Sequence, residues 1–218
     1  MSATSTDQIV QARAERRLLR PRFLAAAGIL LFLAGLIAFM GIITAEALYP
    51  EGYSTAKNAI SDLGATAPPD SVVEQPSATV FNAAMIVTGL LVLGAAFCLQ
   101  AGFRRAGVTI LTGLTGLGIL GVGVLPGNYG DIHALFALLI FFAGGLAAIV
   151  SRTVQTPPFS VLSTILGVVS LAMLVLYMAL GDNSPMAGLG LGGIERWVAY
   201  PILAWTMSFG GYLMGRAR

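Results

Sequence analysis

Side chains that could do chemistry gather in three short polar clusters of an otherwise apolar chain. The first holds Asn58, Ser61 and Asp62, and the second holds Asp131 and His133. Serine can act as a nucleophile, histidine as its base and a carboxylate as the group that orients the base. Histidine also titrates near neutral pH, at about 6.5, which suits proton transfer. The catalytic hypothesis therefore has Ser61 as nucleophile, His133 as base and Asp62 or Asp131 as orienter.

The spacing of these residues also permits structural roles. Ser61 and Asp62 are adjacent, and Asp131 lies two residues before His133, so neither pair obviously makes the hydrogen bond that a triad needs. Asp131 is better explained as an acid that caps or begins a helix. A histidine in a membrane bundle commonly forms a hydrogen bond between helices.

The third cluster contains Glu195 and Arg196, before an apolar segment, and is preceded by Asp182, Asn183 and Ser184. Glu195 would complement a helix N-terminus, whereas Arg196 would oppose the helix dipole there. A partner carboxylate explains this cation, with Asp62, Asp131 and Glu195 as candidates; a lipid phosphate is the alternative. The candidate ligand-binding residues are accordingly Asn58, Asp131, Glu195 and Arg196.

The composition indicates a membrane protein. Of 218 residues, 56% are hydrophobic and only 10% are charged, whereas a soluble domain carries about 25% charged residues. One Cys and one His exclude a disulfide scaffold and a zinc site of the Cys/His type. No cofactor and no metal ion is expected, and nothing in the pattern indicates binding to nucleic acid.

Six stretches are long and apolar enough to cross a bilayer, which needs about 20 residues per helix. They contain no Asp, Glu, Lys or Arg and are apolar on all sides, which predicts an all-α polytopic bundle and argues against a barrel. We interpret the first as an uncleaved anchor. The spans are about 23–43, 78–101, 107–126, 132–150, 159–181 and 197–215.

Lysine and arginine predict the orientation. With the N-terminus inside, ten of the twelve lie on the cytoplasmic side, and only Lys57 and Arg196 lie outside, a strong positive-inside signal. The N- and C-termini are then cytoplasmic. The chain divides into a basic cytoplasmic segment, a six-helix transmembrane domain, a long outer loop within that domain and a cytoplasmic tail, at 1–22, 23–215, 44–77 and 216–218.

Three local features refine this picture. Residues 54–63 predict a short amphipathic helix at the outer interface, with Asn58, Ser61 and Asp62 on its polar face; simple solvation of that face is the alternative. Six glycines in the third span predict close packing at the centre of the bundle. The glycine-rich run 188–193 is interpreted as a flexible loop.

If the helices form one bundle, the three clusters converge at one outer rim. The motif Asn58-x-x-Ser61-Asp62-Leu63-Gly64, the segment from Pro126 to His133 and the motif Gly193-x-Glu195-Arg196 resemble the bacterial and archaeal membrane family called domain of unknown function 998. The resemblance covers most of the chain and implies a bundle of about six helices. It brings no established reaction, but it marks Asn58, Ser61, Asp62, His133, Glu195 and Arg196 as a site.

Two functions fit these observations nearly equally. The first is binding of a lipid or lipid-like anionic headgroup at the outer leaflet, as a sensor or an accessory subunit. The second is an intramembrane hydrolase or transferase acting on a lipid through Ser61 and His133. A transporter ranks last, because no charged residue lies inside any span. The expected partners are membrane lipids and other membrane protein subunits, and the expected location is the plasma membrane of a prokaryotic cell.

Overall fold

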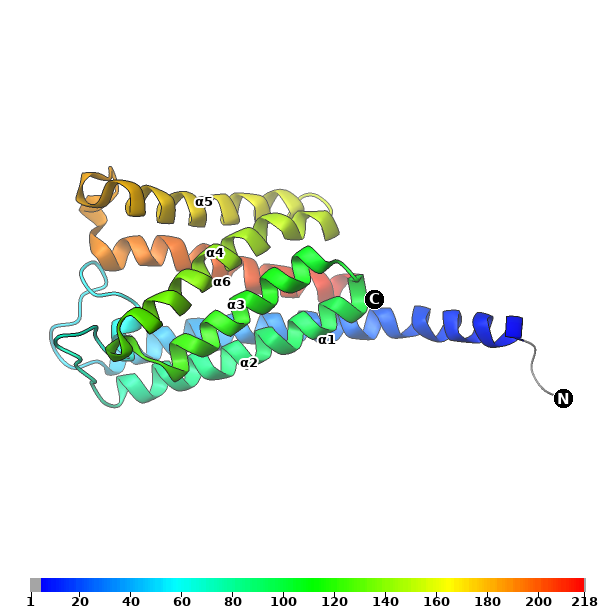
Figure 1. Cartoon of the computed structure of the whole chain (residues 1–218), viewed down its shortest axis with the longest axis horizontal. Helices are drawn as coiled ribbons and strands as arrows, with labels where there is room; N and C mark the ends of the chain where they lie inside the picture. The colour runs from blue at the N-terminus through cyan, green and yellow to red at the C-terminus, as the bar shows by residue number, and fades with distance from the viewer. Residues whose placement is uncertain (1–4, 218) are drawn as a thin grey trace.

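The computed structural model describes residues 5–217, with side chains described from Arg20 onward except at Asp182. It is built of long helices joined by turns and short 3-10 helices, with no strand in this part of the chain (Figure 1). Residues 1–4 of the basic segment and Arg218 of the tail lie outside the described residues. The long helices are α1 Ser5–Leu48, α2 Ser77–Phe103, α3 Ala106–Val124, α4 Asp131–Ser151, α5 Phe159–Leu180 and α6 Gly190–Arg216.

Proline and glycine set several of the helix boundaries. Helix α3 ends two residues before Pro126, and α4 begins directly after Gly130, whose φ is +59°. Helix α5 begins after Pro158 and ends directly before Gly181, whose φ is +51°. Proline lacks the N–H that a helix interior needs, and glycine adopts positive φ without steric cost. The connections are therefore determined locally by the sequence.

The six helices form a closed ring. Each helix packs against the next in the chain, and α6 returns to pack along α1. The predicted central position of the third span is wrong, because α3 is a member of the ring between α2 and α4. Its glycines serve these two contacts: a Cβ on Gly121 would lie 2.2 Å from the Phe136 ring, and one on Gly116 would lie 3.0 Å from the Leu93 nitrogen.

The helices have the lengths and surfaces of membrane spans. Five of them are long and apolar enough to cross a bilayer by length and composition. Large apolar side chains such as Phe97, Ile110 and Leu135 are more than half exposed, as lipid-facing residues require. Helix α6 is also long, at 27 residues, but it is not among these five. The chain thus has the architecture of a helical multi-pass membrane protein.

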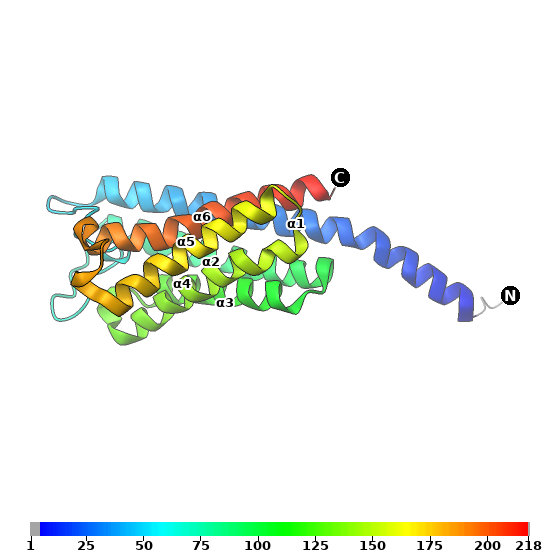
Figure 2. The ribbon, with the colours of Figure 1, turned by 90° about the horizontal axis from the view of Figure 1, so that it is seen from above.

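The two ends of the bundle differ (Figures 1 and 2). The end that we call the loop end carries the long connections 49–76 and 181–189 and the turn 125–130. The end that we call the tail end carries the short connections 104–105 and 152–158 and the C-terminal residues. Helix α1 extends past the tail end, as both views show.

The predicted interfacial helix over residues 54–63 is wrong. This segment holds only a 3-10 helix, Ser61–Leu63, preceded by turns. Side-chain oxygens take the backbone N–H groups that an α-helix would use: the N–H of Ala59 donates to Asp62 at 2.9 Å, and that of Ile60 donates to Glu195 at 2.7 Å. Such side-chain acceptors compete with helical hydrogen bonds, so the segment follows its tertiary contacts instead of its periodicity.

Candidate functional site

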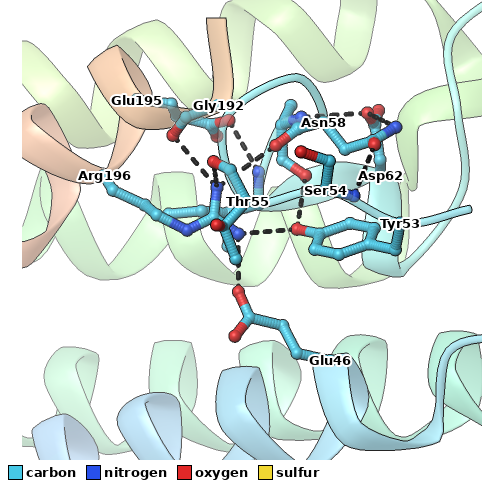
Figure 3. A network of polar contacts seen from close by, with 11 residues as sticks. Glu46, Tyr53, Ser54, Thr55, Asn58, Asp62, Gly192, Glu195 and Arg196 are labelled. Atoms are coloured by element: carbon cyan, nitrogen blue, oxygen red, sulfur yellow. Dashed lines mark hydrogen bonds and ion pairs between the residues drawn. The ribbon is translucent and has the colours of Figure 1, made fainter. Parts of the chain in front are cut away.

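Arg196 is the centre of the polar network at the loop end (Figure 3). Its side chain lies in the second turn of α6, and only 9% of the residue is exposed. One terminal nitrogen donates to the carbonyls of Thr55, Asn58 and Gly192, at 2.9, 3.2 and 3.0 Å. The other donates to Glu46 and to the Tyr53 hydroxyl, at 2.5 and 2.7 Å. The guanidinium therefore joins α1, the loop and α6.

The ion pair of Arg196 with Glu46 corrects the predicted partner. None of the three candidate carboxylates forms a salt bridge with it, and Glu46 does. Glu46 lies in the last turn of α1, where a negative charge opposes the helix dipole. Arg196 lies near the start of α6, where a positive charge opposes it. Each charge is poorly placed for its own helix, and the pair compensates both.

Tyr53 fixes the loop against this pair. Its hydroxyl donates to the carbonyl of Ala59 at 3.0 Å and accepts from Arg196, whose guanidinium lies 5.8 Å from the ring centroid. Burial raises the pKa of the Tyr53 phenol to about 12, although the adjacent Arg196 acts in the opposite direction. The phenol is thus protonated at neutral pH, as its donor role to Ala59 requires.

The glycine-rich run before the third cluster is a docking surface for the loop and not a flexible loop. Its last residues begin α6, and the N–H of Gly192 donates to the carbonyl of Ala56 at 2.9 Å. A Cβ on Gly192 would lie 2.0 Å from the Asn58 oxygen, and one on Gly190, whose φ is +70°, would lie 2.3 Å from the Ala56 oxygen. Only glycine permits this approach of the two backbones.

The two remaining acids of the site organise backbone and amide groups. Asp62 accepts from the N–H of Ala59 and, at 3.4 Å, from the side-chain amide of Asn58. The carbonyl group of the Asn58 side chain in turn accepts from the N–H of Ser54 at 2.9 Å. Glu195 accepts from the N–H of Ile60 through one oxygen. Neither Asp62 nor Glu195 has an ion-pair partner among the described residues.

A narrow cavity of about 80 Å³ lies beneath the docked loop, inside the helix ring. Its polar residues at the loop end are Ser61, His133 and Glu195, and the rest of its lining is almost entirely apolar. Glu195 and Thr206 both line it from α6, and they are separated by about 16 Å along a helix with a rise of 1.5 Å per residue. The cavity is lined by α1, α2, α3, α4, α6 and residues 60–61 of the loop.

His133, which lines this cavity, has one unpaired nitrogen. The residue is only 7% exposed, and its Nδ1 lies 2.7 Å from the carbonyl oxygen of Leu125. A carbonyl only accepts hydrogen bonds, so Nδ1 carries the proton and donates. In the neutral imidazole Nε2 is then an acceptor, and this buried atom has no partner in the described structure. The first turn of α4 therefore holds an unused hydrogen-bond acceptor at the cavity's polar end.

The structure distributes the predicted residues over three places. Ser61, His133 and Glu195 line the cavity, and Asn58, Asp62 and Arg196 belong to the loop network above it. Asp131 is exposed at the first residue of α4 and makes no side-chain cap. Although Ser61 and His133 share the cavity, no hydrogen bond joins them in the described structure, since Nε2 is unpaired.

Sequence reasoning missed Glu46 and Tyr53. Glu46 was visible as an acid at the C-terminal end of the first span, which is the unfavourable end for a negative charge. That signal would have paired it with Arg196. Tyr53 had no comparable signal. No group of three or more His, Cys, Asp or Glu residues that could hold a metal ion occurs in the described part of the chain.

Comparison with known proteins yields one family. The family described as "Protein of unknown function (DUF998)" matches residues 32–211, which include α2 to α5, parts of α1 and α6 and all the site residues above. No curated protein and no solved structure matches the chain.

Proposed function

The chain belongs to the family described as "Protein of unknown function (DUF998)", and we propose from its own geometry that it binds a single-chain amphiphile of the membrane in the cavity at the loop end. The apolar chain of the ligand occupies the ring, and its polar end bonds to His133 and Ser61. Binding without turnover makes the protein a sensor or an accessory subunit.

The observation that carries this proposal is the unpaired Nε2 of His133 in a largely apolar cavity. A buried acceptor without a hydrogen bond costs about 1–3 kcal/mol, so a ligand that supplies the donor recovers this cost. The narrow cavity suits one short alkyl chain better than a two-chain lipid. A largely apolar pocket with a few polar groups is typical of small-molecule sites.

The polar end of the ligand differs from the anionic headgroup that the sequence favours. All five acceptors of Arg196 come from the protein itself. Binding of a phosphate by this guanidinium would have to break the ion pair with Glu46. His133, Ser61 and Glu195 are the groups at the polar end of the cavity that can still form hydrogen bonds with a ligand.

The site belongs to the outer leaflet in the proposed topology. All six helices cross the membrane, α6 through residues 197–215, with both termini cytoplasmic. Nine of the eleven Lys and Arg residues in the described range 5–217 then lie at or beyond the tail end, as the positive-inside rule requires. The membrane is the plasma membrane of a prokaryotic cell, as the resemblance of the sequence implies.

Cysteine labelling tests this topology. In a Cys98→Ala background, Gly188→Cys reports the loop end and Gly215→Cys reports the tail end; a side chain at either glycine meets no atom within 4 Å. A membrane-impermeant maleimide should label the first variant in intact cells and the second only after permeabilisation. Labelling of both in intact cells, or the reverse pattern, contradicts the topology.

Binding is tested with octan-1-ol and two matched variants of α4. Ala137 lines the cavity, whereas Leu135 is 66% exposed on the same helix. Radiolabelled octan-1-ol is equilibrated with the protein in nanodiscs, and the label in empty nanodiscs is subtracted. Saturable binding should be lost in Ala137→Phe, which fills the cavity, and unchanged in Leu135→Phe.

The proposal is wrong if the wild-type protein shows no saturable binding or if both variants bind like it. Because Ala137→Phe overpacks the ring, its melting temperature is measured first. If this variant does not fold, Ala199→Leu fills the same cavity from α6 with a smaller side chain.

A second candidate function is a hydrolase or transferase that acts on a lipid. Ser61 and His133 line the same cavity, and this shared lining favours it. The ligand would have to bring the serine hydroxyl to the free Nε2. Hydrolysis of p-nitrophenyl octanoate by the wild-type protein, lost in both Ser61→Ala and His133→Gln, would support this function; hydrolysis that persists in Ser61→Ala would remove the nucleophile.

A further inference from the structure

The polar end of the cavity is rich in acceptors and poor in donors. His133 offers the lone pair of Nε2, and Glu195 uses one carboxylate oxygen for the N–H of Ile60. The backbone N–H of Ser61 also lies close enough to this carboxylate to lower its pKa, and no side chain donates to it in the described structure. The Ser61 hydroxyl can donate, and it is the only donor side chain among these three when Glu195 is ionised. A ligand that fits this end must therefore supply hydrogen-bond donors.

The acids at this end favour a cationic ligand. Burial raises the pKa of the Glu195 carboxyl to about 7, so a cationic head would stabilise its ionised form. Arg196 is neutralised by Glu46, and neither Lys nor Arg lines the cavity. Glu195 and Ser61 line the cavity, and Asp62 follows Ser61 directly in the chain. Without a cation partner in the described structure, these carboxylates repel an anion, and a partly buried site screens that repulsion less than water does.

The excess of hydrogen-bond acceptors and the acidic residues both constrain the head group of the ligand. A carboxylate or phosphate head would place acceptors against acceptors and negative charge against negative charge. A hydroxyl head donates one hydrogen bond to His133 and is neutral. An ammonium head donates three hydrogen bonds and compensates the charge of Glu195, which makes its hydrogen bonds stronger than those of a neutral group.

We infer, on the basis of the proposed amphiphile site, that the ligand carries a hydrogen-bond-donating head without negative charge, and that an alkyl ammonium group fits best. His133 accepts from the head, Glu195 supplies the counter-charge, and the alkyl chain extends toward Thr206. Arg196 takes no part in contact with the ligand: it holds the loop that brings residues 60–61 to the cavity.

The test compares three probes with the same chain and different heads: octylamine, octan-1-ol and octanoate. Each is titrated into the protein in zwitterionic nanodiscs at about pH 8, where the amine is an ammonium, octanoate is an anion and the Glu195 carboxyl, with a pKa of about 7, is mainly ionised. Octylamine should bind about tenfold or more tighter than octan-1-ol, since hydrogen bonds to charged groups exceed neutral ones by this order. Octanoate should bind more weakly than octan-1-ol.

Glu195→Gln separates the charge from the hydrogen bond. Glutamine keeps an acceptor for the N–H of Ile60 but removes the negative charge. The preference for octylamine over octan-1-ol should fall by about tenfold in this variant, whereas the affinity for octan-1-ol should stay within about twofold. Glu51→Gln, which changes an exposed acid of the same loop, is the matched control and should leave all three affinities unchanged.

The outcomes distinguish this inference from the proposed function. If octanoate binds as tightly as octylamine, or if Glu195→Gln leaves the preference intact, the inferred head chemistry is wrong while the cavity is still a binding site. If none of the three probes binds saturably, or if binding survives in Ala137→Phe, the proposed function fails and this inference fails with it.

Discussion

Helix α6 carries one arginine at each end of the bundle, and the two are held differently. Arg196 at the loop end is 9% exposed and is paired with Glu46. Arg216 at the tail end is exposed, donates to the carbonyl of Val154 and to the hydroxyl of Tyr212, and has no salt bridge in the described structure. Both arginines hold a connecting segment against α6 through hydrogen bonds to its carbonyls, but only Arg196 is buried.

The helix dipole explains why only one of them needs a carboxylate. A cation near the C-terminus of a helix is stabilised by the dipole, and a cation near the N-terminus is destabilised. Arg216 therefore needs no counter-ion, whereas Arg196 combines burial with an unfavourable position. At the loop end, a single guanidinium forms an ion pair and donates hydrogen bonds to three carbonyls. This network positions the loop segment over the cavity.

The other polar contacts repeat the contrast. At the tail end, Ser151 donates to the carbonyl of Ala148 and accepts from the indole of Trp205 at 3.0 Å. At the loop end, Ser61 has no side-chain hydrogen bond and His133 has an unpaired nitrogen, and both line the cavity. The tail end also has an unpaired buried atom, the side-chain nitrogen of Gln155. The contrast is therefore one between individual residues: the Ser151 hydroxyl is hydrogen-bonded, and the Ser61 hydroxyl and the Nε2 of His133 are not in the described structure.

The largest expected difference between the two ends concerns their arginines. Arg196→Ala should lower the free energy of unfolding by about 3–5 kcal/mol, because it leaves Glu46 without its partner and the loop carbonyls without a donor. Arg216→Ala should cost about 1 kcal/mol or less, as exposed charged contacts do. Unfolding of the two variants in the same detergent measures both, and equal losses would contradict the contrast.

The glycines of α6 give the next largest difference. Gly192→Ala should cost about 1–3 kcal/mol, because its Cβ would overlap the Asn58 carbonyl and displace the docked loop. Gly211→Ala, on the same helix nearer the tail end, meets no atom within 4 Å and should stabilise the helix by about 0.5–1 kcal/mol. Destabilisation of similar size in both variants would show that helix packing, and not the loop, is being measured.

The serines give the smallest difference. Ser151→Ala should cost about 1–2 kcal/mol, since it leaves the Trp205 indole N–H without its acceptor. Ser61→Ala should change the stability by less than about 0.5 kcal/mol, because its hydroxyl has no partner in the described structure. A cost for Ser61→Ala as large as that for Ser151→Ala would mean that its hydroxyl serves the fold and is not free for a ligand.

The sequence predicts the helices well and the loop end only in part. Long apolar segments bounded by glycine and proline locate the helices, because a chain in lipid must satisfy its backbone internally. The convergence of Ser61, His133 and Glu195 follows from ring closure between α1 and α6. By contrast, the periodicity of residues 54–63 misleads, since the acceptor for the N–H of Ile60 comes from 135 residues further along the chain.

Long-range contacts also explain why the predicted central position of α3 and the predicted flexible loop at residues 188–193 were wrong. Glycines of α3 indicate close packing but do not say how many neighbours a helix has, so the central position was wrong. The glycines before Arg196 suggest flexibility, yet they serve the approach of residues 55–58, which no local pattern reveals. Local propensity determines the elements here, and contacts between the loop and α6 determine the site.

The protonation state of the His133 imidazole decides whether the loop end holds the proposed ligand site. It is the only histidine of the chain, so ¹⁵N-histidine labelling gives one imidazole in the NMR spectrum of the protein in nanodiscs. We expect a neutral ring with the proton on Nδ1, and a Nε2 signal that moves toward the hydrogen-bonded position when octan-1-ol is added. A proton on Nε2 in the free protein, or a Nε2 signal that does not respond to saturating octan-1-ol or octylamine, would contradict a ligand site at the loop end.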